Sequence, residues 1–356
     1  MGLGEAARST WRGACAVGLP VRLIDLPLQD RAREENAFPM EDESQCFPIN
    51  VFHFNPDVIS LLMKEPSASC YRAGKYNIAF WFWETTDLPV HWVDAACLFN
   101  EIWTGSDFCK EVIAKRVRKP VFKIPLSISP TTPSAEMPGR QYFGLPLAAY
   151  LFLTTSDFNS TAERKNPFAA LDAFEKAFGC TPQNAYLVIK ALNPGSHSAY
   201  KQITQRSRKN PSIIVIDKAL SRNELNGLFN AVDCFLSPHR AEGFGLPIAE
   251  AMSLGKPVIA TGWSANMEFM TAQNSFPIHY TLKQLDHDAL PYPKGTLWAE
   301  PDIDHIAAIM RKLVDNPGIG AEVGQRAKAD ILDLLSPEKT GEALKRRLTD
   351  IWKNLP

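Results

Sequence analysis

The sequence has no excess of charge of either sign, no long apolar run and no closely paired cysteines. Its 356 residues include 38 Lys and Arg against 39 Asp and Glu, which gives a net charge of −1. Nucleic-acid binding usually needs a basic excess, so we expect no nucleic-acid partner.

The longest uninterrupted apolar run, Leu145 to Leu153, is far too short to span a bilayer. The first five residues also lack the layout of a signal peptide. We therefore expect a cytoplasmic location, with peripheral attachment to the inner membrane face left open.

Cysteine spacing argues against a disulfide framework or a zinc site. The seven cysteines stand at positions 15, 46, 70, 97, 109, 180 and 234, an odd number without a Cys-x-x-Cys pair. Both kinds of site need regular, close spacings. We therefore expect buried thiols in a reducing cytoplasm.

Short apolar runs alternate with longer amphipathic segments along almost the whole chain. Continuous apolar strands separated by helices are typical of parallel sheets that helices cover on both faces. The predicted strands are Val21–Leu26, Ile49–Phe54, Ile78–Trp83, Ile102–Gly105, Val121–Ile124, Ala148–Thr154, Tyr186–Lys190, Ser212–Ile216, Cys234–Ser237 and Pro257–Thr261. The predicted helices include Ala6–Val17, Phe108–Arg116, Arg164–Phe178, Ser221–Asn230 and Pro247–Leu254. The pattern predicts an α/β protein with two doubly wound, Rossmann-like domains.

A stretch rich in Pro, Ser and Thr separates the two sets of strands. It runs from Ser127 to Tyr142 and has no apolar period, which is typical of an interdomain linker. We therefore predict domains at residues 1–130 and 143–335, and a single C-terminal helix at residues 336–356.

The first residues have the pattern of a glycine loop that opens a helix. Gly2-x-Gly4-x-x-Ala7 fits the dinucleotide fingerprint, and Asp25 follows at about the expected distance. In that fingerprint the loop follows the first, central strand of the sheet, and no strand precedes Gly2. We therefore expect a first domain that lacks its first strand, and we keep a nicotinamide-dependent oxidoreductase as an alternative activity.

The most informative stretch is Ser237–Met252, which reads Ser-Pro-His-Arg-Ala-Glu-Gly-Phe-Gly-Leu-Pro-Ile-Ala-Glu-Ala-Met. It follows an apolar strand and enters a helix. Its glycines let the backbone approach a ligand and leave amide N–H groups free at the helix start. Because Glu242 precedes the helix and Glu250 lies on it, the two carboxylates can converge on one cleft. There they would accept hydrogen bonds from sugar hydroxyls.

This stretch resembles the Glu-x7-Glu signature of the retaining glycosyltransferases of family four, which have the GT-B fold of two Rossmann-like domains facing a cleft. The segment Gly255–Thr261 continues the match. The resemblance implies that Glu242 faces the donor sugar and Glu250 the ribose of a nucleoside diphosphate sugar. It implies that the C-terminal helix crosses back to the first domain. It also implies that the sugar and phosphate end is lined by the backbone of Gly243, Phe244, Gly245 and Leu246.

A basic motif, Glu163-Arg164-Lys165-Asn166-Pro167, opens a helix after a strand. Two cations at a helix start oppose the helix dipole unless an anion lies there, and a diphosphate is such an anion. The motif resembles the family's basic motif, which implies that Lys165, with Arg164, neutralises the leaving diphosphate. Lys190 ends a parallel strand and so points at the same crevice, where we expect it to help bind the donor.

The first domain supplies further candidates around Phe80–Pro89. Four of the eight Trp fall between positions 81 and 103, and both a core role and stacking on sugar rings fit them. In many relatives a strand here ends in a His that contacts the donor sugar, and this sequence has Glu84 instead. We therefore take Glu84 as a catalytic candidate beside Glu242 and Lys165, with His53 as a second possibility or a core residue.

These observations predict a glycosyltransferase that moves a hexose, with mannose as a first guess, from a nucleoside diphosphate sugar to a glycan or lipid-linked acceptor. The resemblance implies retention of configuration. No Asp-x-Asp motif occurs in the segments expected to face the cleft, so we expect no required metal and no cofactor. The alternative in another class is a non-catalytic carbohydrate-binding relative.

Overall fold

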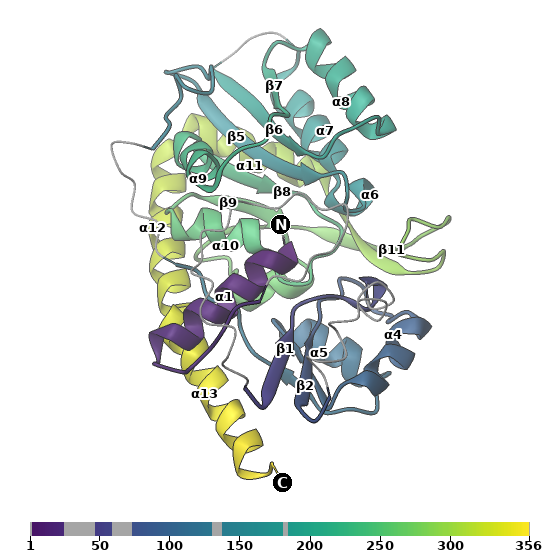
Figure 1. Ribbon diagram of the computed structural model, residues 1–356. Helices are drawn as coiled ribbons and strands as arrows, with labels where there is room; N and C mark the ends of the chain where they lie inside the picture. The colour runs from purple at the N-terminus through teal and green to yellow at the C-terminus, as the bar shows by residue number, and fades with distance from the viewer. Residues whose placement is uncertain (1, 25–46, 59–72, 130–136, 181–183, 356) are drawn as a thin grey trace. The chain divides into compact units, whose positions relative to one another are not determined.

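Nine of the ten predicted strands form two parallel sheets in the computed structural model, which describes residues 2–24, 47–58, 73–129, 137–180 and 184–355. The predicted strand Val21–Leu26 is wrong for residues 21–24, which form no strand, and its last two residues lie outside the described part. The chain divides into two units (Figure 1). Unit 1 comprises residues 1–129 and 335–356, and unit 2 comprises residues 130–334. The prediction of an α/β chain with parallel sheets is therefore confirmed.

Unit 1 contains a four-stranded parallel sheet in the order β1-β2-β3-β4. Its strands are β1 (Ile49–Phe52), β2 (Tyr76–Phe80), β3 (Glu101–Thr104) and β4 (Val121–Lys123). Its helices are α1 (Gly2–Ala16), η1 (Pro56–Val58), α4 (Val90–Ala95), η2 (Ala96–Leu98), α5 (Asp107–Ala114) and α13 (Pro337–Lys353). The predicted absence of a first strand stays a prediction, because residues 25–46 and 59–72 lie outside the described part.

The predicted glycine loop at the front is wrong, because Gly2 and Gly4 form the first turn of helix α1. The buried residues of α1 recur with the spacing of one helical face, and this period decides the local structure. They are Glu5, Ala6, Ser9, Thr10, Gly13 and Ala14. The fingerprint assignment needed a glycine loop before the helix, and both glycines already belong to the helix. Gly2 and Gly4 therefore form no phosphate-binding loop.

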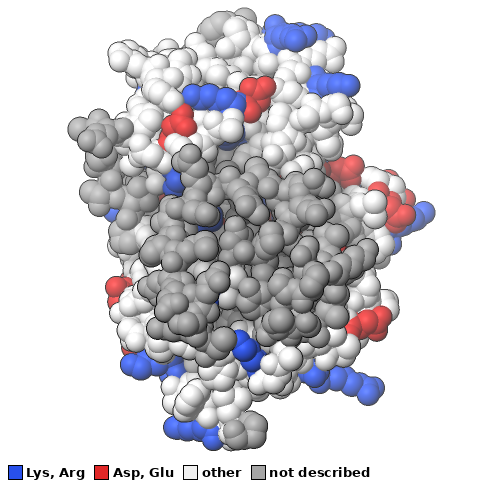
Figure 2. Space-filling model, viewed as in Figure 1, with Lys and Arg blue, Asp and Glu red and all other residues white. Residues whose placement is uncertain are grey.

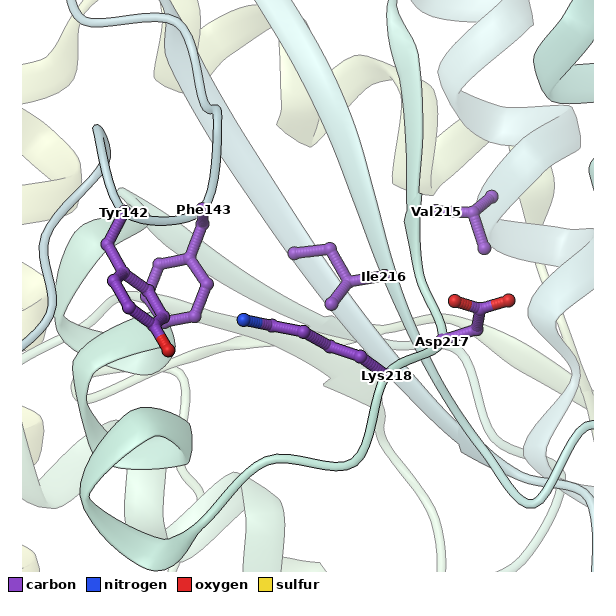
Figure 3. Close-up of a pocket in the computed structure, with 6 residues that line it drawn as sticks. All are labelled: Tyr142, Phe143, Val215, Ile216, Asp217 and Lys218. Atoms are coloured by element: carbon purple, nitrogen blue, oxygen red, sulfur yellow. The ribbon is translucent and has the colours of Figure 1, made fainter.

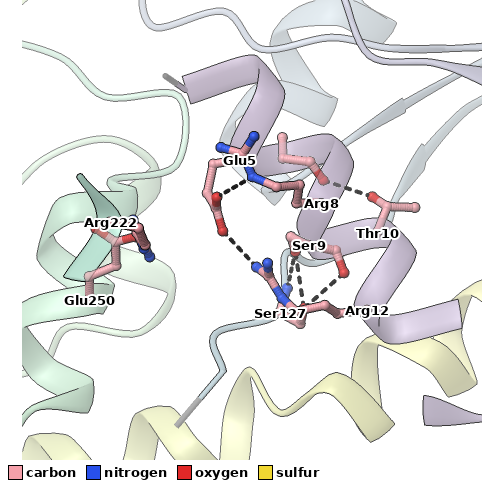
Figure 4. Close-up of polar contacts among 9 residues, drawn as sticks. Glu5, Arg8, Ser9, Thr10, Arg12, Ser127, Arg222 and Glu250 are labelled. Atoms are coloured by element: carbon pink, nitrogen blue, oxygen red, sulfur yellow. Dashed lines mark hydrogen bonds and ion pairs between the residues drawn. The ribbon is translucent and has the colours of Figure 1, made fainter. Parts of the chain in front are cut away.

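Helix α1 is fixed by close packing and by polar contacts within unit 1. It crosses α13 closely, since a Cβ atom at Gly341 would lie only 2.2 Å from the carbonyl oxygen of Gly13. The Ser127 hydroxyl donates to the carbonyl oxygen of Ser9 at 2.9 Å (Figure 4). The absence of side chains at the crossing lets the C-terminal helix pack against the first one.

The tryptophans of unit 1 belong to its core. Trp81, Trp83, Trp92 and Trp103 are at most 1 % exposed. The Trp92 ring lies edge-on to those of Trp81 and Trp83, with centroids 5.5 and 4.9 Å away. Rings this deeply buried cannot stack on a sugar in solution, so the core interpretation holds for all four.

Unit 2 contains a six-stranded parallel sheet in the order β10-β9-β8-β5-β6-β7. Its strands are β5 (Tyr150–Asp157), β6 (Ala185–Leu192), β7 (Ile213–Ile216), β8 (Cys234–Ser237), β9 (Val258–Thr261) and β10 (Phe276–Ile278). Its helices are α6 (Ala162–Lys165), α7 (Pro167–Phe178), α8 (Ser198–Lys209), α9 (Arg222–Ala231), α10 (Leu246–Ser253), η3 (Ala265–Glu268), α11 (Ile303–Asp315) and α12 (Pro317–Leu334). The core on one face of the sheet gathers side chains from α7, α8 and α11.

Two features of the unit 2 sheet position the candidate site. Strands β5 and β8 are direct neighbours and run parallel, with Phe152 opposite Cys234. Consequently the segments that follow both strands leave the same edge of the sheet. After β10 the chain forms an antiparallel hairpin of β11 (Tyr280–Gln284) and β12 (Leu297–Pro301), which projects from the sheet in Figure 1.

Charges of both signs are scattered among uncharged side chains on the described part of the face in Figure 2. Among the described residues, no helix combines the length and the apolar character that crossing a membrane would require.

Candidate active site

Glu242 lies in the turn that joins β8 to α10. Gly245 is the N-cap of α10 and adopts φ 92°, a conformation that glycine tolerates better than other residues. The Glu242 amide donates to Ser264 Oγ at 2.9 Å, and the Glu242 residue is only 7 % exposed. The predicted sugar-lining residues Gly243 and Phe244 follow in the same turn, and Phe244 is buried against Phe269. The local sequence thus holds a buried carboxylate at the carboxyl end of a parallel strand.

The two predicted cations lie beside this carboxylate. Arg164 and Lys165 end the four-residue helix α6, which follows β5, the neighbour of β8. The Lys165 ammonium donates to a carboxylate oxygen of Glu242, and an Arg164 guanidinium nitrogen lies 3.5 Å from the other oxygen. Arg164 also donates to the carbonyl oxygen of Ala241 at 2.8 Å. The three residues therefore form one ionic cluster, which we call the Glu242 cluster.

The charges in this cluster determine the protonation of Glu242. Burial by itself would raise the pKa of Glu242, but Lys165 and Arg164 outweigh that effect and lower the pKa to about 2. Burial lowers the pKa of the neighbouring His239 to about 4, so this imidazole is neutral at pH 7. Two cations and one carboxylate leave the cluster with a net positive charge. An anionic ligand would be attracted to it.

The depressed pKa of Glu242 predicts a specific loss of stability in acid. The ionised carboxylate contributes fully above its usual pKa of 4.5, and the contribution is lost as the pH falls towards about 2. At about 1.4 kcal/mol per pKa unit, we expect the loss to reach about 3 kcal/mol. Urea unfolding between pH 6 and pH 2 should reveal this loss in the wild type and not in Glu242→Gln. Parallel pH profiles for the two proteins would contradict the ionic assignment.

Glu250, the second carboxylate of the signature, lies on α10. Its carboxylate pairs with Arg222 at the first position of α9, with an N–O distance of 2.6 Å (Figure 4). The Glu250 side chain is 18 % exposed and that of Arg222 is 52 % exposed, so solvent reaches this pair. Sequence reasoning did not assign a role to Arg222.

Lys190 lies on β6 and does not reach the Glu242 cluster through any contact recorded for the described residues. It is 2 % exposed, and its ammonium donates to the carbonyl oxygen of Ala191 at 2.6 Å. Burial lowers the pKa of Lys190, while Asp217 and Asp157 act in the opposite direction. Its predicted role in donor binding stays a prediction.

The candidates from the first domain belong to unit 1. Glu84 follows β2 and is half-buried. The ring of His53 stacks on Phe80 with centroids 4.6 Å apart, and burial lowers the pKa of His53 to about 3. A neutral, stacked imidazole fits the core interpretation of His53. The catalytic role of Glu84 stays a prediction.

A pocket at the carboxyl end of β7 was not predicted (Figure 3). The Lys218 side chain extends towards two aromatic rings, with its ammonium 4.4 Å from the Tyr142 ring centroid and 5.8 Å from that of Phe143. The pocket is lined by Tyr142, Phe143, Val215, Ile216, Asp217 and Lys218. It includes none of the predicted site residues.

Metal-ligating side chains do not cluster in the described ranges. No group of three or more His, Cys, Asp or Glu residues there could hold a metal ion.

Arg240 is the site-region residue that sequence reasoning most clearly missed. Its guanidinium forms two hydrogen bonds of 2.8 Å with Glu300 of β12. The pair is separated by 60 positions, and no sequence period links them. The only feature of the sequence that could have indicated a role for Arg240 was its position inside the Ser237–Met252 stretch.

One family model matches part of unit 2. Residues 151–316 match the family model described as "Glycosyl transferases group 1". That segment contains α6, the Glu242 turn, α10 and the hairpin. No curated protein matches the sequence.

Solved structures of glycosyltransferases share the fold. HepE of Anabaena, solved in complex with UDP and glucose, has a TM-score of 0.64 and 16 % identity over 85 % of this chain and 78 % of its own. The pneumococcal O-GlcNAc transferase GtfA, solved with UDP and GlcNAc, has a TM-score of 0.60 and 16 % identity over 85 % of this chain and 57 % of its own. Sucrose-phosphate synthase of Thermosynechococcus elongatus has a TM-score of 0.63 and 13 % identity over 86 % of this chain and 74 % of its own. The chain thus has the GT-B fold, and its residues 151–316 are similar to the group 1 glycosyl transferases.

Proposed function

We propose that the protein is a retaining glycosyltransferase that transfers a hexose from a nucleoside diphosphate sugar to a glycan or lipid-linked acceptor. The Glu242 cluster carries the proposal, because it combines two cations for a diphosphate with an ionised carboxylate for a sugar. The group 1 domain over residues 151–316 supports the same activity. The structures of HepE and GtfA, solved with UDP, make uridine a candidate nucleoside of the donor, and the resemblance to family four makes guanosine another.

The roles follow from charge. As the bond between the sugar C1 and the diphosphate oxygen breaks, negative charge grows on the diphosphate. Lys165 and Arg164 stabilise this charge in a partly buried environment, where the electrostatic effect is larger than in water. The acceptor oxygen bonds to C1 on the same face, and its proton passes to the departing phosphate oxygen.

The two signature carboxylates have separate parts in this proposal. Glu242 accepts hydrogen bonds from the sugar hydroxyls and remains ionised because its pKa is about 2. Glu250, more open to solvent and paired with Arg222, takes the ribose hydroxyls. The two cations perform the charge neutralisation, so we propose that no metal is required.

A screen of nucleotides and a transfer assay test the proposal together. UDP or GDP at 100 times its dissociation constant should stabilise the protein by about 2.7 kcal/mol, which thermal unfolding detects. With the matching UDP- or GDP-hexose and a panel of glycans and glycolipids, the product should keep the anomeric configuration in NMR spectra. Transfer should persist in EDTA. The proposal is wrong if no nucleoside diphosphate stabilises the protein and no donor sugar is consumed.

A further inference from the structure

Arg240 uses its whole side chain in contacts within unit 2. Besides its two hydrogen bonds to Glu300, its guanidinium donates to the carbonyl oxygen of Glu163 in α6 at 2.6 Å. The guanidinium carbon lies 4.9 Å from the ring centroid of Trp298 in β12. The Arg240 side chain is 19 % exposed. Its positive charge is therefore neutralised by Glu300 and covered by an aromatic ring.

The backbone of Arg240 joins the same two elements. Its amide donates to the carbonyl oxygen of Arg164 at 2.7 Å, and its carbonyl oxygen accepts from the amide of Ala299 at 2.9 Å. Arg240 thus connects α6, the turn that carries Glu242, and the hairpin. Because these backbone bonds do not need the side chain, a substitution at Arg240 should leave the fold intact.

Helix α6 depends on such contacts for its position. It has only four residues, and its C-cap residue Asn166 adopts φ 55°, so its own hydrogen bonds cannot fix its position. The hairpin makes two further contacts with it or its N-cap. Thr161 Oγ1 donates to the carbonyl oxygen of Leu290 at 2.7 Å, and His287 Nε2 lies 3.1 Å from a Glu163 carboxylate oxygen. The hairpin and Arg240 therefore hold α6 from its amino end to its carboxyl end.

We propose that Arg240, anchored by Glu300, is a positioning residue that sets the location of the Arg164 and Lys165 cations relative to Glu242. The inference rests on the proposed function, because those cations are the ones assigned to the diphosphate. The charge of Arg240 is already paired, so it acts through α6 and not on the ligand directly. It also gives the projecting hairpin a role, which is to fix the diphosphate-binding segment.

Two variants and a matched control test this inference. Arg240→Gln removes the positive charge of the Arg240–Glu300 ion pair, and Glu300→Gln removes its negative charge. Arg206→Gln is the control, because Arg206 also forms two ion pairs of 2.6 Å, with Asp172 and Glu175, in the same unit. Arg206 lies on α8 and has no recorded contact with α6. Any effect of losing an ion pair in general should therefore be the same in the control.

The first measurement needs no ligand. Hydrogen exchange of peptides covering residues 161–166 should become faster in Arg240→Gln, since the amides of Arg164, Lys165 and Asn166 depend on a properly held α6. Exchange of these peptides in Arg206→Gln should match the wild type. Unchanged exchange in Arg240→Gln would overturn the inference.

The second measurement is the affinity for UDP and GDP against UMP and GMP, determined by calorimetry. Arg240→Gln should weaken diphosphate binding by about tenfold, the size of a charged hydrogen bond, and leave monophosphate binding nearly unchanged. Glu300→Gln should shift the ratio in the same direction, and Arg206→Gln should not. A purely structural role would weaken both nucleotides equally, and that result would overturn the inference. If the wild type binds neither diphosphate while α6 still exchanges faster in Arg240→Gln, the proposed function fails and the positioning of α6 stands.

Discussion

Replacing Lys165 by alanine should lower kcat for glycosyl transfer by about 10²- to 10³-fold, the usual cost of removing one preorganised donor from a transition state. The Lys165 side chain is 18 % exposed and its ammonium contacts Glu242, so it acts where water screens charge poorly. Its stabilising effect should grow as the diphosphate departs. Steady-state kinetics with the best donor from the nucleotide screen measures the change.

The same substitution should alter Glu242. Lys165 and Arg164 together hold the pKa of Glu242 at about 2, so removing one cation should raise this pKa. Glu242 would then keep only the Arg164 guanidinium at 3.5 Å as an ion-pair partner among its recorded contacts. The acid limb of the kcat profile should therefore move to higher pH in Lys165→Ala. This shift separates an electrostatic role from a loss of folding.

Two controls bound the interpretation of Lys165→Ala. Lys165→Arg keeps the positive charge and should retain more activity than the alanine variant. Lys176→Ala removes an exposed lysine that pairs with Asp304 elsewhere in unit 2, and it should keep wild-type kinetics. If Lys165→Ala is as active as the wild type, the proposed catalytic role of Lys165 is wrong.

The sequence allowed the unit 2 site to be predicted because its parts are local. The Glu242 turn, its glycines and α10 lie within one short stretch after a strand. The adjacency of the α6 cations follows from a rule of parallel sheets, in which segments after neighbouring strands leave the same edge. What the pattern did not reveal was that the side chains of Lys165 and Glu242 contact each other directly.

Two features of unit 2 were not predicted from the sequence: the break between α6 and α7, and the contact between Arg240 and Glu300. One predicted helix, Arg164–Phe178, is divided into α6 and α7 at Asn166, which precedes Pro167 and adopts a left-handed conformation. The sequence did indicate that break, since the α-helical conformation is unfavourable for a residue that precedes proline. The Arg240–Glu300 pair had no such signal in the sequence, because its two residues are 60 positions apart and Glu300 is placed by the pairing of β11 with β12.

A second large effect is expected in unit 1, from Arg347→Ala. The Glu101 carboxylate is fully buried and accepts from Trp103 Nε1 at 2.6 Å and from the Tyr76 hydroxyl at 3.0 Å. Arg347 of α13 is its ion-pair partner, with Nε 3.1 Å from a carboxylate oxygen, and also lies over the ring of Phe122. Removing one partner of a buried pair costs about 3–5 kcal/mol, because the other charge stays buried and uncompensated. Urea unfolding should show a loss of this size.

The stability change should be confined to unit 1 and should depend on the charge of Glu101. Hydrogen exchange should become faster in peptides from residues 76–123 and 337–353 and stay unchanged in those from β5 and β6. Arg346→Ala, which removes the exposed neighbouring arginine, should have little effect. Combining Arg347→Ala with Glu101→Gln should recover part of the loss, since a neutral amide needs no counter-charge and can still accept from Trp103. If the double variant is instead less stable than Arg347→Ala alone, the burial of an unpaired charge is not the cause, and lost packing on Phe122 accounts for the effect.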